Sequence, residues 1–309
     1  MLPQIYERLL DISSAIDIPV TVFGMYIVYC YSPPNMGSLN LFIFKIMAWN
    51  LVANLAGVAV HFHPLFPAEC LRAEGIASMF IVSDLVGYSV FGLVGVAAIQ
   101  CTLASSMTFP YRYIVVAHSE YASKIKRKYG IAVCGAVHLC AFCFGIYFYT
   151  YLVVRYDDYP PELRPADPRG VFCFEPNGSL KYMMGILAVI CTLFLLLVII
   201  IFSILMKRHL SKVYLQYNAW TTGLETQTKF LRYLIAITIV PVLFGGVPLV
   251  LLLLCGAFPE ISYSHEIFMC STVVLYNHGT VFAVVSIVSL KAYRHAAQTI
   301  VCNLGKKLH

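Results

Sequence analysis

Residues 85–111 read LVGYSVFGLVGVAAIQCTLASSMTFPY and contain no Asp, Glu, Lys or Arg. This segment has 27 residues, and a helix needs only about 20 apolar residues to cross the hydrocarbon core of a bilayer. Arg112 follows directly, between two tyrosines. Lipid offers no partners to backbone N–H and C=O groups, so a spanning segment of this kind must be helical. The stretch therefore predicts a transmembrane helix that ends near an arginine.

The whole chain has the composition of a membrane protein. Hydrophobic residues make up 60% of its 309 residues and charged residues 12%, whereas soluble domains carry about 25% charged residues. The apolar runs are continuous and do not alternate, which argues against a β-barrel. We predict an all-α membrane protein in which residues 1–309 form a single seven-transmembrane helix bundle. Its spans are 12–31, 39–60, 82–107, 129–151, 182–204, 233–255 and 267–289.

The distribution of Lys and Arg predicts the orientation of the bundle. With the N-terminus outside, 13 Lys and Arg residues fall in the inner loops and tail, and 6 fall in the outer loops. Cytoplasmic loops carry the excess of basic residues, so we expect an outside N-terminus and a cytoplasmic C-terminus. The single N-x-S/T sequon begins at Asn177, after the fourth span. It lies on the predicted outer side and is a candidate N-glycosylation site.

Three cysteines outside the spans carry specific expectations. Cys70 and Cys173 fall in outer loops, where oxidising conditions favour disulfides, and are a candidate pair. The pairing stays open at this point, because Cys70 lies well upstream of the third span. In the tail at 290–309, apolar residues recur at helical spacing beside basic ones, as in a helix that lies on a membrane surface. Cys302 in this tail is a candidate palmitoylation site, and a frayed tail is the alternative.

The sequence contains few of the features expected of an enzyme or a transporter. It contains no HExxH or GxSxG motif and no three-histidine cluster in adjacent spans, so we expect no catalytic activity, no metal and no cofactor. Transporters usually show an internal repeat and several buried ionisable residues. No repeat is evident, and Asp17 and Asp84 are placed near the predicted outer ends of their spans. We expect the remaining intramembrane polar residues to form hydrogen bonds between helices; these residues are Asn50, Asn54, Gln100, His138, Asn277 and His278.

A seven-helix receptor accounts better for the sixth predicted span. Pro241 and Pro248 each remove a backbone hydrogen bond, and their spacing of seven residues puts them on nearly one helix face. Gly245 and Gly246 between them loosen the helix further. These four residues form a candidate hinge, which a receptor needs in order to change shape at its cytoplasmic side. A transporter or ligand-gated channel is the alternative.

The same residues give the chain a family resemblance. It resembles nematode serpentine chemoreceptors, most closely class H in the Str superfamily of seven-transmembrane G-protein-coupled receptors. The match runs in order along nearly the whole chain, although Ala292 replaces the proline expected before Tyr293. The residues that carry it are Pro19, Phe23, Gly24, Tyr26, Pro33, Met36 and Trp49, the Phe66-Pro67-Ala68 segment, Pro241 with Pro248, and His278 with Gly279.

This resemblance implies how the protein works. A small-molecule odorant or pheromone would bind among the outer halves of the helices, and a heterotrimeric G protein would bind at the inner face. The implied setting is the lipid bilayer of the plasma membrane, in a sensory cilium, with no nucleic acid as partner. Arg112 and Tyr113 stand where the family has an acid-Asn-Arg-aromatic motif, so the resemblance implies that they face the G protein. Pro110 and Tyr111 replace the acid and its neighbour, so no adjacent carboxylate can pair with Arg112. The alternative is an arginine that only anchors the helix end.

Overall fold

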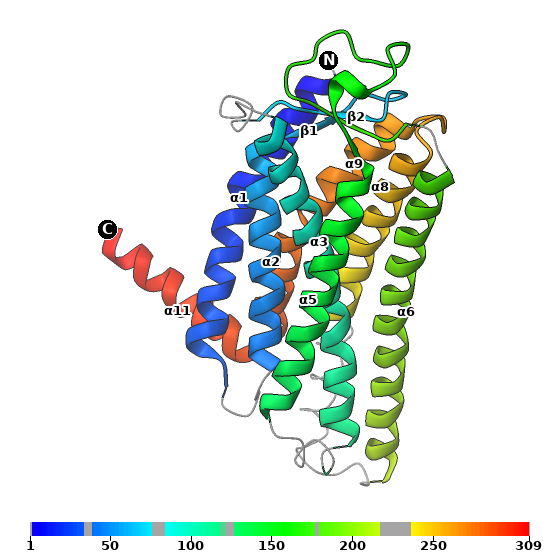
Figure 1. Cartoon of the computed structure of the whole chain (residues 1–309). Coiled ribbons are helices and arrows are strands. Elements are labelled where there is room, and N and C mark those ends of the chain that lie inside the picture. The colour runs from blue at the N-terminus through cyan, green and yellow to red at the C-terminus, as the bar shows by residue number, and fades with distance from the viewer. Residues whose placement is uncertain are drawn as a thin grey trace.

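A computed structural model of the chain describes residues 2–33, 39–75, 84–118, 120, 127–176, 179–216 and 236–308. Within these ranges, seven helical segments are long and apolar enough to cross a membrane, which confirms the all-α seven-span prediction. They pack side by side into one bundle (Figure 1). The helices are α1 (Leu2–Tyr31), α2 (Leu39–Val60), α3 (Asp84–Ala117), α5 (Arg127–Leu152), α6 (Ser179–Gln216), α8 (Val247–Ala257), α9 (Ser264–Tyr276), α10 (His278–Ser289) and α11 (Lys291–Leu308).

Two of the spans differ from the sequence-based boundaries in ways that matter for function. The first apolar segment runs over Gln4–Tyr31, whereas the predicted span begins at residue 12. As a result, Asp17 lies at the middle of α1 and is only 1% exposed, and its expected position near an outer end is wrong. The third segment extends to Ala117, so Arg112 lies inside α3 and not at its end.

The sixth and seventh spans are each built from two pieces. The sixth contains a π-helical segment, η4 (Pro241–Gly246), which α8 continues. The seventh consists of α9 and α10, joined at Asn277. The main buried core lies where α1, α2, α3, α6 and α10 meet, and Tyr293 of α11 is part of it. In Figure 1, α11 then runs outward from the bundle.

A small antiparallel sheet covers one end of the bundle (Figure 1). Its four strands are β1 (Phe62–Pro64), β2 (Cys70–Ala73), β3 (Val153–Val154) and β4 (Val171–Phe174), in the order β1-β2-β4-β3. We call this end the sheet end and the other the opposite end. The sheet joins the α2–α3 connection to the long segment between α5 and α6, so the two loops form one structural unit.

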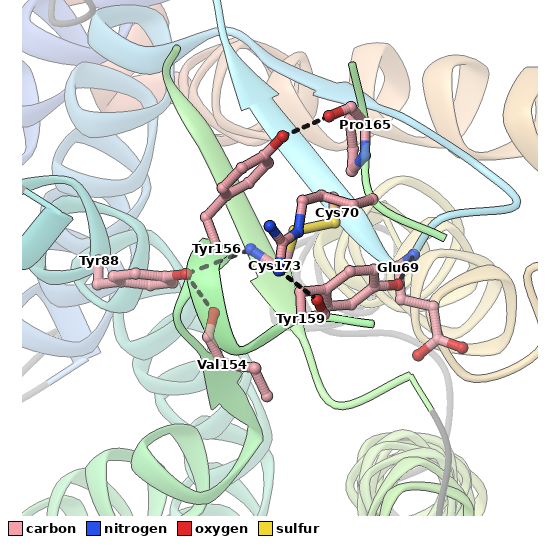
Figure 2. The surroundings of a disulfide bond; sticks show 9 residues. Glu69, Cys70, Tyr88, Val154, Tyr156, Tyr159, Pro165 and Cys173 are labelled. Carbon is pink, nitrogen blue, oxygen red and sulfur yellow. Dashed lines mark hydrogen bonds between the residues drawn. A yellow bond between two sulfur atoms is a disulfide. The ribbon is translucent and has the colours of Figure 1, made fainter. Parts of the chain in front are cut away.

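A disulfide and a tyrosine hold the sheet together and attach it to the bundle. Cys70 of β2 and Cys173 of β4 form a disulfide across directly paired positions (Figure 2). Tyr88, near the start of α3, donates a hydrogen bond to the Val154 carbonyl at 2.6 Å and accepts one from the Cys173 N–H at 3.3 Å. The covalent bond therefore joins two loop strands, and it is Tyr88 that ties them to the third helix. Asn177, the candidate glycosylation site, lies outside the described residues.

An ion pair between Glu69 and Lys181 links the sheet to the start of α6. The Lys181 ammonium contacts the Glu69 carboxylate, and the two side chains are only 6% and 10% exposed, respectively. Burial raises the pKa of the Glu69 carboxyl from 4.5 to about 7, and the hydrogen bond and charge of Lys181 oppose this effect only in part. The protonation of Glu69 is thus coupled to the stability of the sheet end.

This coupling predicts that the protein loses stability as pH rises. The folded protein holds the Glu69 proton more tightly than the unfolded chain, so the contribution is fully present below pH 4.5 and is lost as pH rises to about 7. The loss is expected to reach about 3 kcal/mol at most, from about 1.4 kcal/mol per pKa unit. Thermal unfolding of the purified protein between pH 5 and about 8 measures it. Glu69→Gln is expected to reduce the pH dependence but not to remove it, because burial also raises the pKa of Glu74 to about 7, whereas Glu162→Gln, at an exposed residue of the same end, should leave it unchanged. Identical pH curves for the wild type and Glu69→Gln would contradict the assignment.

Candidate functional site

A cavity of about 70 Å³ lies among the midpoints of the helices. It is deeper in the bundle than the outer helix halves where the sequence analysis expects a ligand. Most of its wall is apolar, with a few amide, hydroxyl and imidazole groups. It is lined by Asn50, Ala53 and Asn54 of α2, by Val94, Ala98, Cys101, Thr102 and Ser105 of α3, by Leu196 and Ile199 of α6, by Pro241, Gly245, Gly246 and Leu249 of η4 and α8, and by Leu275, Tyr276 and His278 of α9 and α10.

One side of the cavity adjoins a buried polar cluster around Asp17. The Asp17 carboxylate accepts a hydrogen bond from the Asn54 amide and another, of 2.6 Å, from the Thr280 hydroxyl. The Asn54 amide also donates to the Tyr276 carbonyl at 3.1 Å. A Cβ at Gly279 would lie 2.9 Å from the Asp17 carboxylate, so a glycine is what allows α1 and α10 to approach this closely. The cluster fixes α1, α2 and the seventh span relative to one another.

His278 and Asn277 extend these contacts between helices. The His278 Nδ1 atom lies 2.9 Å from the Asn50 side-chain oxygen, and the ring is only 3% exposed. The Asn277 amide donates to the Ser13 hydroxyl at 2.9 Å and to the Val273 carbonyl at 2.8 Å. Four of the six polar residues singled out from the sequence, Asn50, Asn54, Asn277 and His278, thus lie close together, at the contacts of α1 and α2 with the seventh span.

Gln100 and His138 form a separate pair between α3 and α5. The His138 Nδ1 atom contacts the Gln100 side-chain oxygen, and the Gln100 amide donates to the His138 carbonyl at 3.0 Å. The polar residues singled out from the sequence therefore fall into two groups. Sequence reasoning missed Asp17 and Thr280 as members of the first group. The signal for Asp17 was present, because Leu10, Ser14, Asp17 and Thr21 recur every three or four residues on the buried face of α1.

The candidate hinge residues coincide with η4. The π-helical segment covers Pro241, Gly245 and Gly246, and Pro248 follows in the first turn of α8. Proline has no backbone N–H and leaves one helical hydrogen bond unmade, which favours such an irregular turn. Turns of the π-helical type are common at functional sites. A Cβ at Gly246 would clash with the side chain of Leu196, so Gly246 is where α6 packs directly on the sixth span.

Arg112 is buried near the opposite end of the bundle. Its guanidinium lies 5.6 Å from the centre of the Phe109 ring, and the residue is 3% exposed. It is close enough to Tyr293 of α11 to lower the pKa of that phenol, although burial raises this pKa more. Tyr293 is fully buried and shares a hydrogen bond of 2.7 Å with the Ser32 hydroxyl. Arg112 is therefore covered in this structure, and its contact with a G protein stays a prediction.

Tyr113 lies on the same stretch of α3 and packs against α6. Its ring centre lies 5.6 Å from that of Phe202 and 5.7 Å from that of His118.

Cys302, the candidate palmitoylation site, is exposed on α11. Among the described residues, no group of three His, Cys, Asp or Glu side chains is arranged to hold a metal ion. The described residues thus provide a ligand with a small, mostly apolar cavity that has a few hydrogen-bonding groups.

Comparison with known protein families gives one match. A family model described as serpentine type 7TM GPCR chemoreceptor Srh matches residues 2–303. This covers nearly the whole chain and confirms the resemblance to nematode serpentine chemoreceptors of the Str superfamily. No curated protein sequence matches the chain significantly.

Proposed function

Because the chain belongs to the Srh family of serpentine chemoreceptors, we propose that its central cavity binds a small environmental molecule and that this binding activates a heterotrimeric G protein. The protein is a chemosensory G-protein-coupled receptor and a multi-pass membrane protein. This family is a receptor family and not an enzyme class. What remains to be proposed is the ligand site, the coupling route and the orientation of the chain.

The observation that carries the proposal is the contact between the cavity and η4. Pro241, Gly245 and Gly246 all line the cavity, so a ligand there would touch the irregular part of the sixth span. A π-helical turn accommodates an additional residue, and its conversion to α-helix would rotate the residues beyond it by about 100°. A ligand that favours one form would therefore change how the rest of this span faces its neighbours.

If the π-helical and α-helical forms of the sixth span belong to two states of the receptor, the buried position of Arg112 fits the resting state. In the active state, we propose, the sixth span moves away from α3 and exposes Arg112 and Tyr113 to the G protein. The guanidinium would then offer several hydrogen-bond donors to backbone carbonyls of the partner. The inner connections at 118–129 and 205–229 are proposed to meet the G protein as well, and about half of their residues lie outside the described part of the chain.

The sheet end is proposed to face outward, in the plasma membrane of a sensory cilium. The disulfide between Cys70 and Cys173 supports this orientation, because disulfides persist in oxidising compartments. The excess of Lys and Arg in the predicted inner loops and tail supports it as well. The N-terminus would then lie outside and the C-terminus in the cytoplasm.

Reconstitution separates the receptor from a transporter or ligand-gated channel. We expect purified protein in lipid vesicles to accelerate GDP–GTP exchange on an added heterotrimer when an active odorant is present. The same vesicles without G protein are expected to show no odorant-dependent ion or solute flux. Flux without G protein, with no effect on nucleotide exchange, would contradict the coupling and favour the transport alternative.

A further inference from the structure

The strongest unassigned feature of the cavity is the second ring nitrogen of His278. His278 lines the cavity and is 3% exposed, and within the part of the chain that the structure describes no hydrogen-bond partner reaches its Nε2 atom. A Cβ at Gly245 would lie 3.3 Å from Nε2, so this nitrogen faces η4 across the cavity wall. A buried polar atom without a partner costs free energy, which a bound ligand can recover.

The hydrogen bonds around His278 determine which kind of ligand this nitrogen accepts. The Asn50 amide nitrogen donates to the Ile46 carbonyl at 3.1 Å, so its side-chain oxygen is the group that faces His278. An amide oxygen only accepts hydrogen bonds, so the proton must be on Nδ1, which lies 2.9 Å from it. In a neutral imidazole the other nitrogen is then an acceptor. No ion pair to His278 occurs among the described residues, and an unpaired buried charge is costly, so the ring is neutral.

Two neighbouring polar side chains in the cavity wall already donate hydrogen bonds within the protein. The Asn54 amide donates to Asp17 and to the Tyr276 carbonyl. The Thr102 hydroxyl donates to the Ala98 carbonyl at 2.9 Å. The Tyr276 hydroxyl is buried without a hydrogen-bond partner among the described residues, and it lies over Gly57, toward the sheet end. His278 Nε2 is therefore a buried acceptor in this wall that has no partner among the described residues and can take a hydrogen bond from a ligand.

We propose that the cavity selects small neutral molecules with one O–H or N–H donor, such as short-chain alcohols, and that His278 Nε2 accepts this hydrogen bond. The size of the cavity supports a small molecule, since about 10–15 Å³ of such cavity volume holds one water molecule and this cavity offers about 70 Å³. The apolar wall excludes ions, and a ligand without a donor would leave Nε2 without a partner. This inference names the ligand class of the proposed function, and rests on that function only in taking the cavity as the ligand site.

Three probes of nearly equal size and shape test the selection. 2-Propanol has a hydroxyl donor, acetone only a neutral acceptor, and acetate only an anionic one. Each is added to the purified full chain in lipid nanodiscs, with ¹⁵N-labelled histidine rings. The His278 signal is identified by its loss in His278→Phe. We expect 2-propanol to shift the Nε2 resonance and to bind at least tenfold more tightly than acetone or acetate.

Two glycine variants provide a matched control that leaves the histidine in place. Gly245→Ala puts a methyl group beside Nε2, and is expected to abolish the preference for 2-propanol. Gly95→Ala adds the same methyl on α3 where no atom lies within 4 Å, and is expected to keep the preference. Equal binding of 2-propanol and acetone would overturn the proposal, as would binding of none of the three probes. Tighter binding of acetate would also overturn it, because it would mean a charged ring.

The assay contains no G protein, so its outcome is independent of signalling. If 2-propanol binds through His278 but neither it nor any other donor drives nucleotide exchange, the ligand class stands and the coupling fails. If the receptor signals to ligands that lack a donor, the coupling stands and the ligand class fails.

Discussion

Arg112→Ala is expected to abolish ligand-dependent nucleotide exchange on the G protein while the amount of folded receptor stays the same. In this structure the guanidinium packs on Phe109 and lies near Tyr293, so the proposed role requires the opposite end to open before a partner can reach it. Alanine removes every donor that the opened face would present there. The measurement is the rate of GTP uptake by a purified heterotrimer, at saturating odorant, normalised to folded receptor.

Two further arginine variants make this result specific. Arg112→Lys keeps the charge but loses the planar donor geometry, and is expected to retain only a small part of the exchange rate. Arg155→Ala changes an exposed arginine at the sheet end, and is expected to leave exchange intact. Normal exchange in Arg112→Ala would refute the role proposed for this residue and leave it as an anchor of α3.

Asp17→Ala is expected to lower the free energy of unfolding by about 2–4 kcal/mol. The change removes the acceptor of the Asn54 amide and of the Thr280 hydroxyl, both in the contact of α1 with its neighbours. Hydrogen bonds between membrane helices often contribute less, about 0.6 kcal/mol on average, because their partners find substitutes in the unfolded state. The larger value is expected here because one carboxylate serves two donors at a site that is 1% exposed. Unfolding in mixed detergent micelles measures the change.

Variants at two aspartates of α1 separate the effect of losing a buried carboxylate from the effect of losing an exposed one. Asp17→Asn keeps one acceptor oxygen but turns an N–H toward the other donor, so it is expected to lose about half as much stability as Asp17→Ala. Asp11→Ala alters an exposed carboxylate that lies 3.4 Å from His61, and is expected to change stability by less than about 0.5 kcal/mol. Equal effects of Asp11→Ala and Asp17→Ala would show that the buried cluster does not stabilise the bundle.

Much of the fold could be predicted from the sequence because lipid constrains the chain strongly. Long charge-free runs such as 85–111 must form helices, and this gives the number of spans and the fold class. Charges at Glu7, Arg8 and Asp11 concealed the beginning of α1, since average hydropathy falls there although the helix continues. This is why Asp17 was expected near an end, when it lies at the middle of the helix.

The candidate site could be predicted only in part. Proline and glycine in the sixth span pointed to an irregular helix, but which residues form the π-helical turn depends on contacts such as that of Gly246 with Leu196. The sheet was not predicted, because strands of two to four residues are too short for a periodic pattern. The environment of His278 depends on Asn50, which is 228 positions away in the chain, and no local pattern carries that pairing.

The length of α6 has a mechanical consequence. With 38 residues, this helix is about 57 Å long, nearly twice the thickness of the hydrocarbon core, which is about 30 Å. The cavity touches it at Leu196 and Ile199, close to its midpoint. Figure 1 shows the helix running from the sheet end to the far limit of the bundle. It can thus act as a rigid lever that pivots beside the cavity, so that a slight tilt at its centre moves its end by several ångströms.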